Sequence, residues 1–359
     1  MRMDELLRKT LELCREPAVT VTEGKLELVN PAAARAFPFL RAGQSIAPLL
    51  PREALEGLPE EAVCLVELAG VSYSLRRVGA GERTCLMFRS EEEPSARGFL
   101  SDGALNGLLS AQCNLELALR RLDDGTEPPG EAETLRAVLR RSASSLRRQL
   151  ENLRLAVAFQ EQTVFYQPRT LELVRPCREL ADGVRDAMED RGVELEFSAE
   201  APSILLDADP ALVERLLLNL LSNAYAHTPA GGRVRLRLAQ AEDRVLLTVS
   251  DNGEGIPSHV LSEVFRRYAS RAGAEDLSPA ASGGLGLYIA SGIARLHGGV
   301  LVIESRSGEG TTVRVSLPRQ TNVSSLESAS VPALPLADAI RTEFAQLLPL
   351  EQFTSRYSD

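Results

Sequence analysis

The chain has 359 residues, 44% of them apolar, and a formal net charge of −10 at pH 7. This length predicts about two or three domains with substantial cores, and the acidic balance disfavours binding to nucleic acid or to an anionic membrane surface. No uncharged apolar run approaches the roughly 20 residues that cross a bilayer, and the start does not resemble a signal peptide. The five cysteines are widely spaced without a CxxC motif, which indicates reduced thiols. We therefore expect a cytoplasmic protein without membrane insertion.

Residues 1–92 are expected to form a small α+β domain. Asn30 and Pro31 predict a helix start, because asparagine caps a helix and proline suits its first position. The predicted elements of this region are a helix over 31–37 and strands over 19–22, 26–29, 64–68, 71–76 and 84–88. With its segment VTEGKLELVNPAAARAF, this order resembles a PAS sensory domain; an unrelated small α+β fold is the alternative.

Residues 93–165 change to helical spacing on both sides of a DDGTEPPG breaker. Apolar residues recur every three or four positions, at Leu105, Leu108, Leu115, Leu119 and Leu122 and then at Leu139, Ala143, Leu146, Leu150, Leu153 and Val157. Two such helices cannot bury their stripes alone, so we expect an antiparallel hairpin that forms a four-helix homodimer. Several arginines lie off this seam and are expected to form a solvated face: Arg140, Arg141, Arg147, Arg148 and Arg154.

Residues 169–318 read as a mixed α/β domain. The pattern predicts helices over 176–191, 210–226 and 284–297, and strands over 193–197, 204–208, 233–239, 245–251, 300–305 and 311–317. In the tail, 319–359, a Ser-rich linker precedes one apolar helical face made of Leu336, Ile340, Phe344, Leu347 and Leu348. We expect this face to dock back on its own protein and not to recruit a partner.

Asn219 and Asn223 are four residues apart, and therefore lie on one face of the predicted helix. Amide oxygens can coordinate Mg²⁺, although two asparagines on one face of a helix are more often a surface feature. In the segment DNGEGIP, Asp251 ends a strand, and Gly253 and Gly255 let the backbone approach a flat ligand. A carboxylate there can accept a hydrogen bond from the exocyclic amine of adenine.

Two further segments carry the same chemistry. SGGLGLYIA opens a helix with Gly284 and Gly286, and small residues at a helix start expose N–H groups to phosphates. GEGTTVRVSLP places Thr311 and Thr312 near the end of the last strand, where a base could lie.

In this order and spacing, these four segments resemble the N, G1, G2 and terminal boxes of the sensor histidine kinases of two-component systems, and VFRRYAS matches the F box of that family. The resemblance implies a multidomain α+β protein whose residues 169–318 form a two-layer α/β sandwich of histidine-kinase, gyrase and Hsp90 type. It implies Mg-ATP as the ligand, with Asn223 on the metal. The residues that it implies for ATP binding are Asn219, Asn223, Asp251, Gly253, Gly255, Phe265, Arg267, Gly284, Gly286, Leu287 and Thr312.

The sequence departs from the family pattern in the pocket and more severely in the hairpin. Ala226 replaces a phosphate-contacting lysine, Ser282 a glycine and Ser270 an arginine, and Arg267 or Arg271 can compensate. The stretch FLSDGALNGLLSAQ aligns with the phosphoacceptor region, but Ala104, Leu105 and Asn106 occupy the place of the histidine and its neighbouring acid. Nucleophile and base are both lost, so we assign no catalytic residue. The three histidines, His227, His259 and His297, are expected to be structural.

We therefore expect a signalling protein that binds Mg-ATP but does not phosphorylate its own hairpin, and that acts as a pseudokinase with a response regulator or a partner kinase. One alternative is an active kinase that phosphorylates a partner in trans on histidine or serine. Another is an ATP-driven switch like gyrase and Hsp90, although these normally have a glutamate where Asn219 stands. A structural protein without nucleotide is the last alternative.

Overall fold

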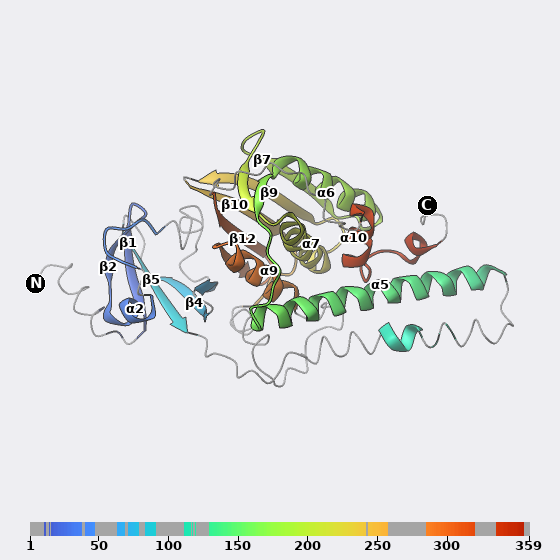
Figure 1. The fold of residues 1–359 in the computed structure, drawn as a ribbon, viewed down its shortest axis with the longest axis horizontal. Helices are drawn as coiled ribbons and strands as arrows, with labels where there is room; N and C mark the ends of the chain where they lie inside the picture. The colour runs from blue at the N-terminus through green and yellow to red at the C-terminus, as the bar shows by residue number, and fades with distance from the viewer. Residues whose placement is uncertain are drawn as a thin grey trace, which may run out of the picture.

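The computed structural model describes residues 11, 14, 16–37, 40–46, 63–68, 71–78, 83–90, 111–115, 117, 119, 129–241, 243–257, 285–319 and 335–354. Its main sheet has the strand order β2-β1-β5-β4-β3-β11-β12-β10-β9-β7, and a small second sheet pairs β6 with β8 (Figure 1). Within the main sheet only β7 and β9 run parallel; the other described neighbours are antiparallel.

The N-terminal elements form where the sequence predicted them: β1 (Ala18–Thr22), β2 (Lys25–Val29), α2 (Pro31–Ala36), β3 (Val63–Leu68), β4 (Val71–Val78) and β5 (Arg83–Ser90). Asn30 caps α2, because its Oδ1 accepts hydrogen bonds from Ala33 N at 2.7 Å and Ala18 N at 3.0 Å. Phe37 stands edge-on to Tyr73 and Phe88, with ring centroids 4.9 and 5.1 Å away. These aromatic rings form the centre of the N-terminal core; the PAS assignment stays a prediction.

The C-terminal half contains the predicted helices and strands and one strand that was not predicted, β6. Its elements are β6 (Arg169–Glu172), α6 (Val174–Ala187), β7 (Glu194–Ala199), β8 (Leu205–Ala208), α7 (Pro210–His227), β9 (Arg233–Ala241), β10 (Arg244–Asp251), α9 (Leu285–Leu296), β11 (Val300–Arg306) and β12 (Gly310–Pro318). Helices α6, α7 and α9 cover one face of the sheet (Figure 1). This is the predicted two-layer α/β arrangement.

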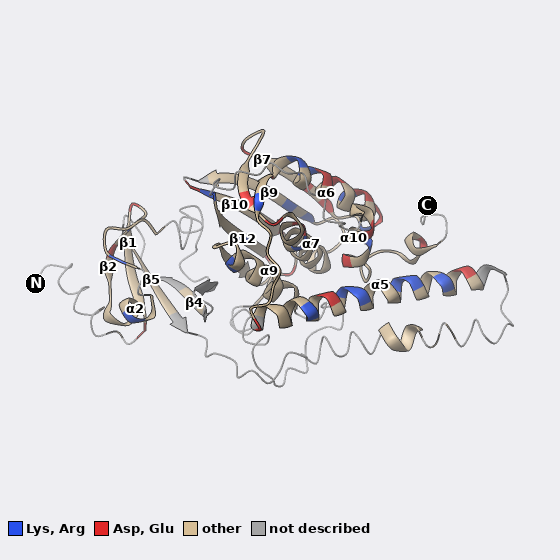
Figure 2. Ribbon diagram, in the orientation of Figure 1, with Lys and Arg blue, Asp and Glu red and all other residues tan. Residues whose placement is uncertain are grey.

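The opposite face of the sheet is polar at one end and apolar at the other. On β9, Arg233 and Arg235 form ion pairs with Glu194 and Glu196 of β7, with Arg235 Nε 2.7 Å from Glu196 Oε2, and Arg237 pairs with Glu200 just after β7. At the other end, Val300 and Val302 of β11 join the N-terminal core. The charged side chains therefore keep the β9 end of this face solvated, whereas the N-terminal core covers the β11 end. Figure 2 marks the charged residues along the ribbon.

Strand β3 continues the sheet onto the edge of β11. The antiparallel register aligns Val302 with Val66 and Glu304 with Cys64. Residues 1–92 and 169–318 were predicted as separate domains, and in the structure strands from both lie in one continuous sheet. Strand periodicity cannot reveal this pairing, because it shows which residues share a face and not which edge meets which.

Helix α5 (Pro129–Gln160) is the predicted second helix of the hairpin, and it packs along the C-terminal half (Figure 1). Phe159 lies against Gly292 of α9, where an added Cβ would meet its ring at 2.8 Å. The predicted leucine seam points elsewhere, and Leu150 is 56% exposed. Of the first predicted helix, 111–115, 117 and 119 are described, and they are helical; the hairpin and its dimer stay predictions.

The prediction that all the α5 arginines are solvated is wrong for Arg148. Its side chain is 6% exposed, whereas that of the neighbouring Arg147 is 50% exposed. The physical reason is that the C-terminal segment covers this position. That segment, α10 (Leu336–Glu343) and η2 (Leu350–Phe353), docks back on the protein as predicted and buries Phe344 completely. Among the described residues, no helix is long and apolar enough to cross a membrane.

Candidate functional site

Helix α7 is fixed at its start by Asp209 and His297. The Asp209 Oδ1 atom accepts hydrogen bonds from Ala211 N at 3.0 Å and Leu212 N at 3.3 Å, which makes Asp209 the N-cap. Its own N–H donates to His297 Nε2 at 3.0 Å, and the ring's Nδ1 lies 2.8 Å from Ile293 O. Burial lowers the pKa of His297, so the neutral ring is favoured. His297 is thus structural, as predicted, and joins the start of α7 to the end of α9.

Asn219 and Asn223 face the start of α9. Asn219 is 0% exposed; its Nδ2 donates to Arg215 O at 2.9 Å, while its Oδ1 has no hydrogen-bond partner among the described residues. A Cβ added at Gly286 would lie 3.1 Å from Asn219 Oδ1 and 3.4 Å from Asn223 Nδ2. The structure therefore brings the first and third predicted segments together, with a glycine opposite two amides.

Asp251 lies at the end of β10, half-buried. Its Oδ1 accepts hydrogen bonds from Gly253 N at 3.0 Å and Thr311 N at 3.2 Å. Neither of these two N–H groups donates to the second carboxylate oxygen, Oδ2. Burial is the largest influence on this carboxyl and raises its pKa above the ordinary value. Such a group is costly to hold in the fold unless a ligand uses its second oxygen.

The turn after Asp251 needs its glycines. An added Cβ at Gly253 would lie 2.1 Å from His227 O, at the end of α7. Gly255 has φ +65°, and its added Cβ would lie 1.8 Å from Arg306 O. The turn is therefore packed between α7 and β11, which fixes the position of Asp251 relative to Asn219 and Asn223 of α7.

The strand register distinguishes Thr311 from Thr312. Asp251 pairs with Thr311, whereas Thr312 pairs with Ser250 and with Glu304. Since neighbouring side chains of a strand point to opposite faces, Thr311 shares the helix-covered face with Asp251 and Thr312 lies on the other. The expected approach of Thr312 to the base does not fit this register. The sequence named both threonines near the base and assigned binding to Thr312, whereas the strand alternation from the buried Val313 would have favoured Thr311.

Other predicted site residues have different positions. Leu287 is partly buried and packs against the main core. Phe265, Arg267 and Gly284 lie outside the described residues, as do Ala104 and Leu105. At the place of the missing lysine, Ala226 is followed by His227, whose Nδ1 lies 2.7 Å from Glu254 Oε1.

The described residues fit a nucleotide with a hard cation. The unpartnered Oδ1 of Asn219 is a buried oxygen donor next to a half-buried amide, and oxygen donors are what Mg²⁺ prefers. Gly286 lies in the first turn of α9, the end of a helix whose backbone N–H groups suit a phosphate. Asp251 lies at the end of β10. Gly253 N and Thr311 N both donate to its Oδ1, and neither of them donates to its Oδ2.

Comparison with known proteins supports the same class. Residues 208–321 match the family described as Histidine kinase-, DNA gyrase B-, and HSP90-like ATPase. The Histidine protein kinase DivJ of Caulobacter vibrioides is 39% identical over 155 residues, which are 41% of this chain and 26% of DivJ. The sensor protein CutS of Streptomyces coelicolor is 28% identical over 294 residues, 79% of this chain and 68% of CutS. The solved Acinetobacter baumannii histidine kinase AdeS has a TM-score of 0.48 at 17% identity, covering 59% of this chain and 97% of that chain.

The fold and the site thus define an ATP-binding domain of the histidine-kinase, gyrase and HSP90 type. Residues 208–321 carry this ATPase domain, and the relatives that match this part of the chain include sensor histidine kinases. The chain covers well under two thirds of the length of the first curated relatives that it matches. It covers 26% of DivJ and 33% of the sensor histidine kinase YvrG of Bacillus subtilis.

Proposed function

We propose that the chain is a two-component signalling protein that binds Mg-ATP between α7, α9 and the end of β10. The observation that carries this proposal is the buried, unpartnered Oδ1 of Asn219 beside Gly286. Buried polar atoms are rarely left without a partner, and an exception suggests a ligand. A glycine opposite the amide keeps that space free of side-chain atoms.

The roles follow from the chemistry of each residue. Asn223 would hold Mg²⁺, with Asn219 assisting the phosphates, and the bound metal would neutralise part of the triphosphate charge. Gly284 and Gly286 would present backbone N–H groups to phosphate. Asp251 would accept the exocyclic amine of adenine on Oδ2, while its Oδ1 stays bonded to the backbone.

We further propose that this protein does not phosphorylate its own hairpin. Ala104, Leu105 and Asn106 offer neither imidazole nor carboxylate, so the nucleophile and its base are both missing from the sequence there. The protein would then act as a pseudokinase, through a response regulator or a partner kinase. The replacement of the pocket lysine by Ala226 is consistent with weakened phosphoryl transfer.

Calorimetry with Mg-ATP tests the binding proposal, and we expect a dissociation constant in the micromolar to sub-millimolar range. No heat of binding by the wild type would sink it. Incubation with γ-labelled ATP, followed by mass spectrometry, tests the second proposal. We expect no phosphohistidine; substantial phosphate on His227, His259 or His297 would make the protein an autokinase with a relocated acceptor.

We also propose that the chain forms a homodimer through the hairpin. The seam residues of α5 are half-buried or exposed in the single chain, and an apolar stripe of this length needs a partner. Leu146→Asp would bury a charge in the seam and should convert the dimer to a monomer in sedimentation. Arg147→Asp, at an exposed neighbouring position, is the control; a wild-type monomer at high micromolar concentration would contradict the proposal.

A further inference from the structure

The C-terminal segment, residues 335–354, contacts three helices that are distant in sequence. A Cβ added at Gly183 of α6 would lie 2.8 Å from Ile340 Cδ1, which shows how closely the two elements pack. The ring of Phe344 stands edge-on to Tyr225 of α7, with centroids 5.8 Å apart. Gln346 Nε2 donates to Ser145 Oγ of α5 at 3.2 Å. The segment therefore joins α5 to the ATP-binding domain.

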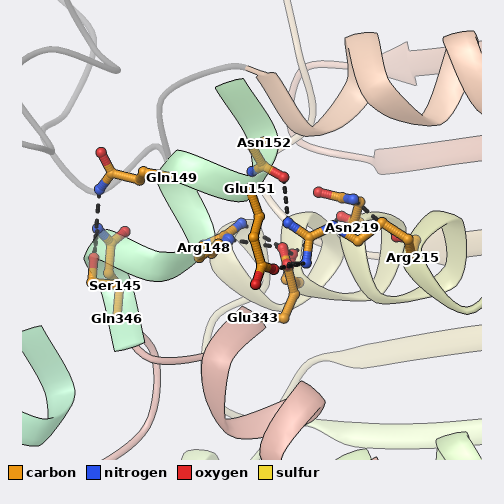
Figure 3. Close-up of polar contacts among 10 residues, drawn as sticks. Ser145, Arg148, Gln149, Glu151, Asn152, Arg215, Asn219, Glu343 and Gln346 are labelled. Carbon is orange, nitrogen blue, oxygen red and sulfur yellow. Dashed lines mark hydrogen bonds and ion pairs between the residues drawn. The ribbon is translucent and has the colours of Figure 1, made fainter. Parts of the chain in front are cut away.

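At the centre of this contact, the last residue of α10 carries a fully buried carboxylate. Glu343 is 0% exposed and lies between α5 and α7 (Figure 3). Its Oε1 is 2.8 Å from Arg148 Nε and accepts a hydrogen bond from Ser222 Oγ at 3.1 Å. Its Oε2 is 3.2 Å from Arg215 NH1. One carboxylate thus faces two guanidinium groups from two different helices.

The arginines are held by further groups on both sides. Arg148 NH2 donates to Ser222 Oγ at 3.3 Å, and Arg215 NH2 donates to Asn152 Oδ1 of α5. The contact of Arg148 Nε with Glu343 has the distance of an ion pair but not the alignment of a hydrogen bond. The cluster is therefore held mainly by charge. Arg215 NH1 also lies 3.6 Å from Glu151 Oε2 of α5. Removing the Glu343 carboxylate would leave the buried Arg148 without an acidic partner among the described residues, and Arg215 with only the more exposed Glu151, which is unfavourable.

This cluster adjoins the proposed nucleotide site along α7. Arg215 lies one turn before Asn219, and its carbonyl oxygen accepts the Asn219 Nδ2–H at 2.9 Å. Ser222 directly precedes Asn223. A triphosphate bound at the two asparagines would attract the same positive charge on α7 that Glu343 neutralises, since charges interact strongly where water is scarce.

We propose that the C-terminal segment is a latch, closed by Glu343, that fixes α5 to the ATP-binding domain and is opened by nucleotide. The latch competes with the triphosphate for the positive charge of Arg215, so tail docking and ATP binding weaken each other. The nucleotide half of this proposal rests on the proposed function; the docking half does not.

Hydrogen exchange without nucleotide tests the docking half on the full chain. Glu343→Gln keeps the shape but removes the charge, and the amides of residues 141–157 should exchange roughly tenfold faster or more. Glu351→Gln, exposed in the same segment, is the matched control and should exchange like the wild type. Arg148→Lys keeps the positive charge and should give an intermediate increase. Unchanged exchange of α5 in Glu343→Gln would overturn the latch.

Calorimetry and exchange with Mg-ATP test the coupling. Glu343→Gln should bind ATP roughly fivefold more tightly than the wild type, and by reciprocity ATP should speed α5 exchange in the wild type by a comparable factor. Equal ATP affinity of the two proteins would overturn the coupling, even if α5 exchange responds to the substitution. A wild type that binds no ATP would refute the proposed function and the coupling together, while the nucleotide-free exchange would still decide the latch.

Discussion

Helix α7 carries two polar clusters that are close in sequence but built in different ways. Arg215 and Ser222 face Glu343 of the C-terminal segment and Arg148 of α5, and the charges of these groups compensate one another, although Arg148 Nε and Glu343 Oε2 have no aligned hydrogen bond among the described residues. Asn219 and Asn223 face Gly286, and the buried Oδ1 of Asn219 has no hydrogen-bond donor within the described part of the chain. The described residues therefore supply opposite charges within the first cluster but no partner for the acceptor in the second.

This difference separates a structural polar cluster from a binding site. Buried charges are retained when partners compensate them, and then their loss shows in folding stability. A buried acceptor opposite a glycine, such as Asn219 Oδ1, carries the cost of desolvation without a compensating hydrogen bond. Its substitution should therefore lower ligand affinity and not folding stability. Substitutions in the first cluster should therefore act mainly on stability and on the docking of α5, with a smaller coupled change in ATP affinity, whereas those in the second should act mainly on ATP affinity.

The largest effect is expected at Arg148. Arg148→Ala leaves Glu343 buried with one arginine fewer, so the free energy of unfolding should fall by about 3 kcal/mol. Arg147→Ala, one residue earlier, removes an exposed pair with Glu151 and should change it by about 0.5 kcal/mol or less. Urea titration of both variants measures this; equal losses would mean that the Arg148 cluster is not structural.

Asp251→Asn is expected to act on binding alone. The amide oxygen can still accept from Gly253 N and Thr311 N, but its N–H₂ group would meet the adenine amine, so ATP affinity should fall roughly ten- to a hundredfold. Because burial raises the Asp251 pKa, the charged form is disfavoured, and the free energy of unfolding at pH 7 should not fall. Calorimetry and urea titration check both parts; a destabilised variant with unchanged affinity would reverse the assignment of Asp251.

A smaller change in affinity is expected for Gly286→Ala. The new methyl group would crowd Asn219 Oδ1 at 3.1 Å, so ATP should bind roughly fivefold more weakly. Alanine is a better helix former than glycine by about 1 kcal/mol, which should offset any loss of stability. The control Gly292→Ala would instead meet Phe159 at 2.8 Å and should destabilise the docking of α5. Unchanged ATP affinity in Gly286→Ala would argue against a ligand beside Asn219.

The smallest effect is a pH dependence from His297. Burial lowers its pKa in the folded state, so between that lowered value and about 6.5 the unfolded chain binds more protons. Its contribution to stability is therefore complete above about pH 6.5 and is lost as pH falls below it. Urea titrations between pH 5 and 7 should show this slope in the wild type and in His227→Gln, but not in His297→Gln. The same slope in all three proteins would assign it to other groups.

Much of the fold follows from local patterns. Asn30 was recognisable as a helix cap because a side-chain oxygen can satisfy N–H groups only at a helix start. Asp251, its glycines and the asparagine pair were also recognisable, since each motif lies within one turn or one strand end. The docking of the tail followed from its apolar helical face.

The sequence by itself determined most of the helices and strands, and it predicted the nucleotide-binding segments and the missing hairpin acceptor at Ala104, Leu105 and Asn106, because each depends on residues that are neighbours along the chain. Only the tertiary structure decided that β3 extends the sheet at β11, and that Arg148 is buried while Arg147 is solvated. It also decided that Glu343 closes a cluster with α5 and α7. These features depend on contacts between distant segments, and the burial of a charge is fixed by whichever segment covers it.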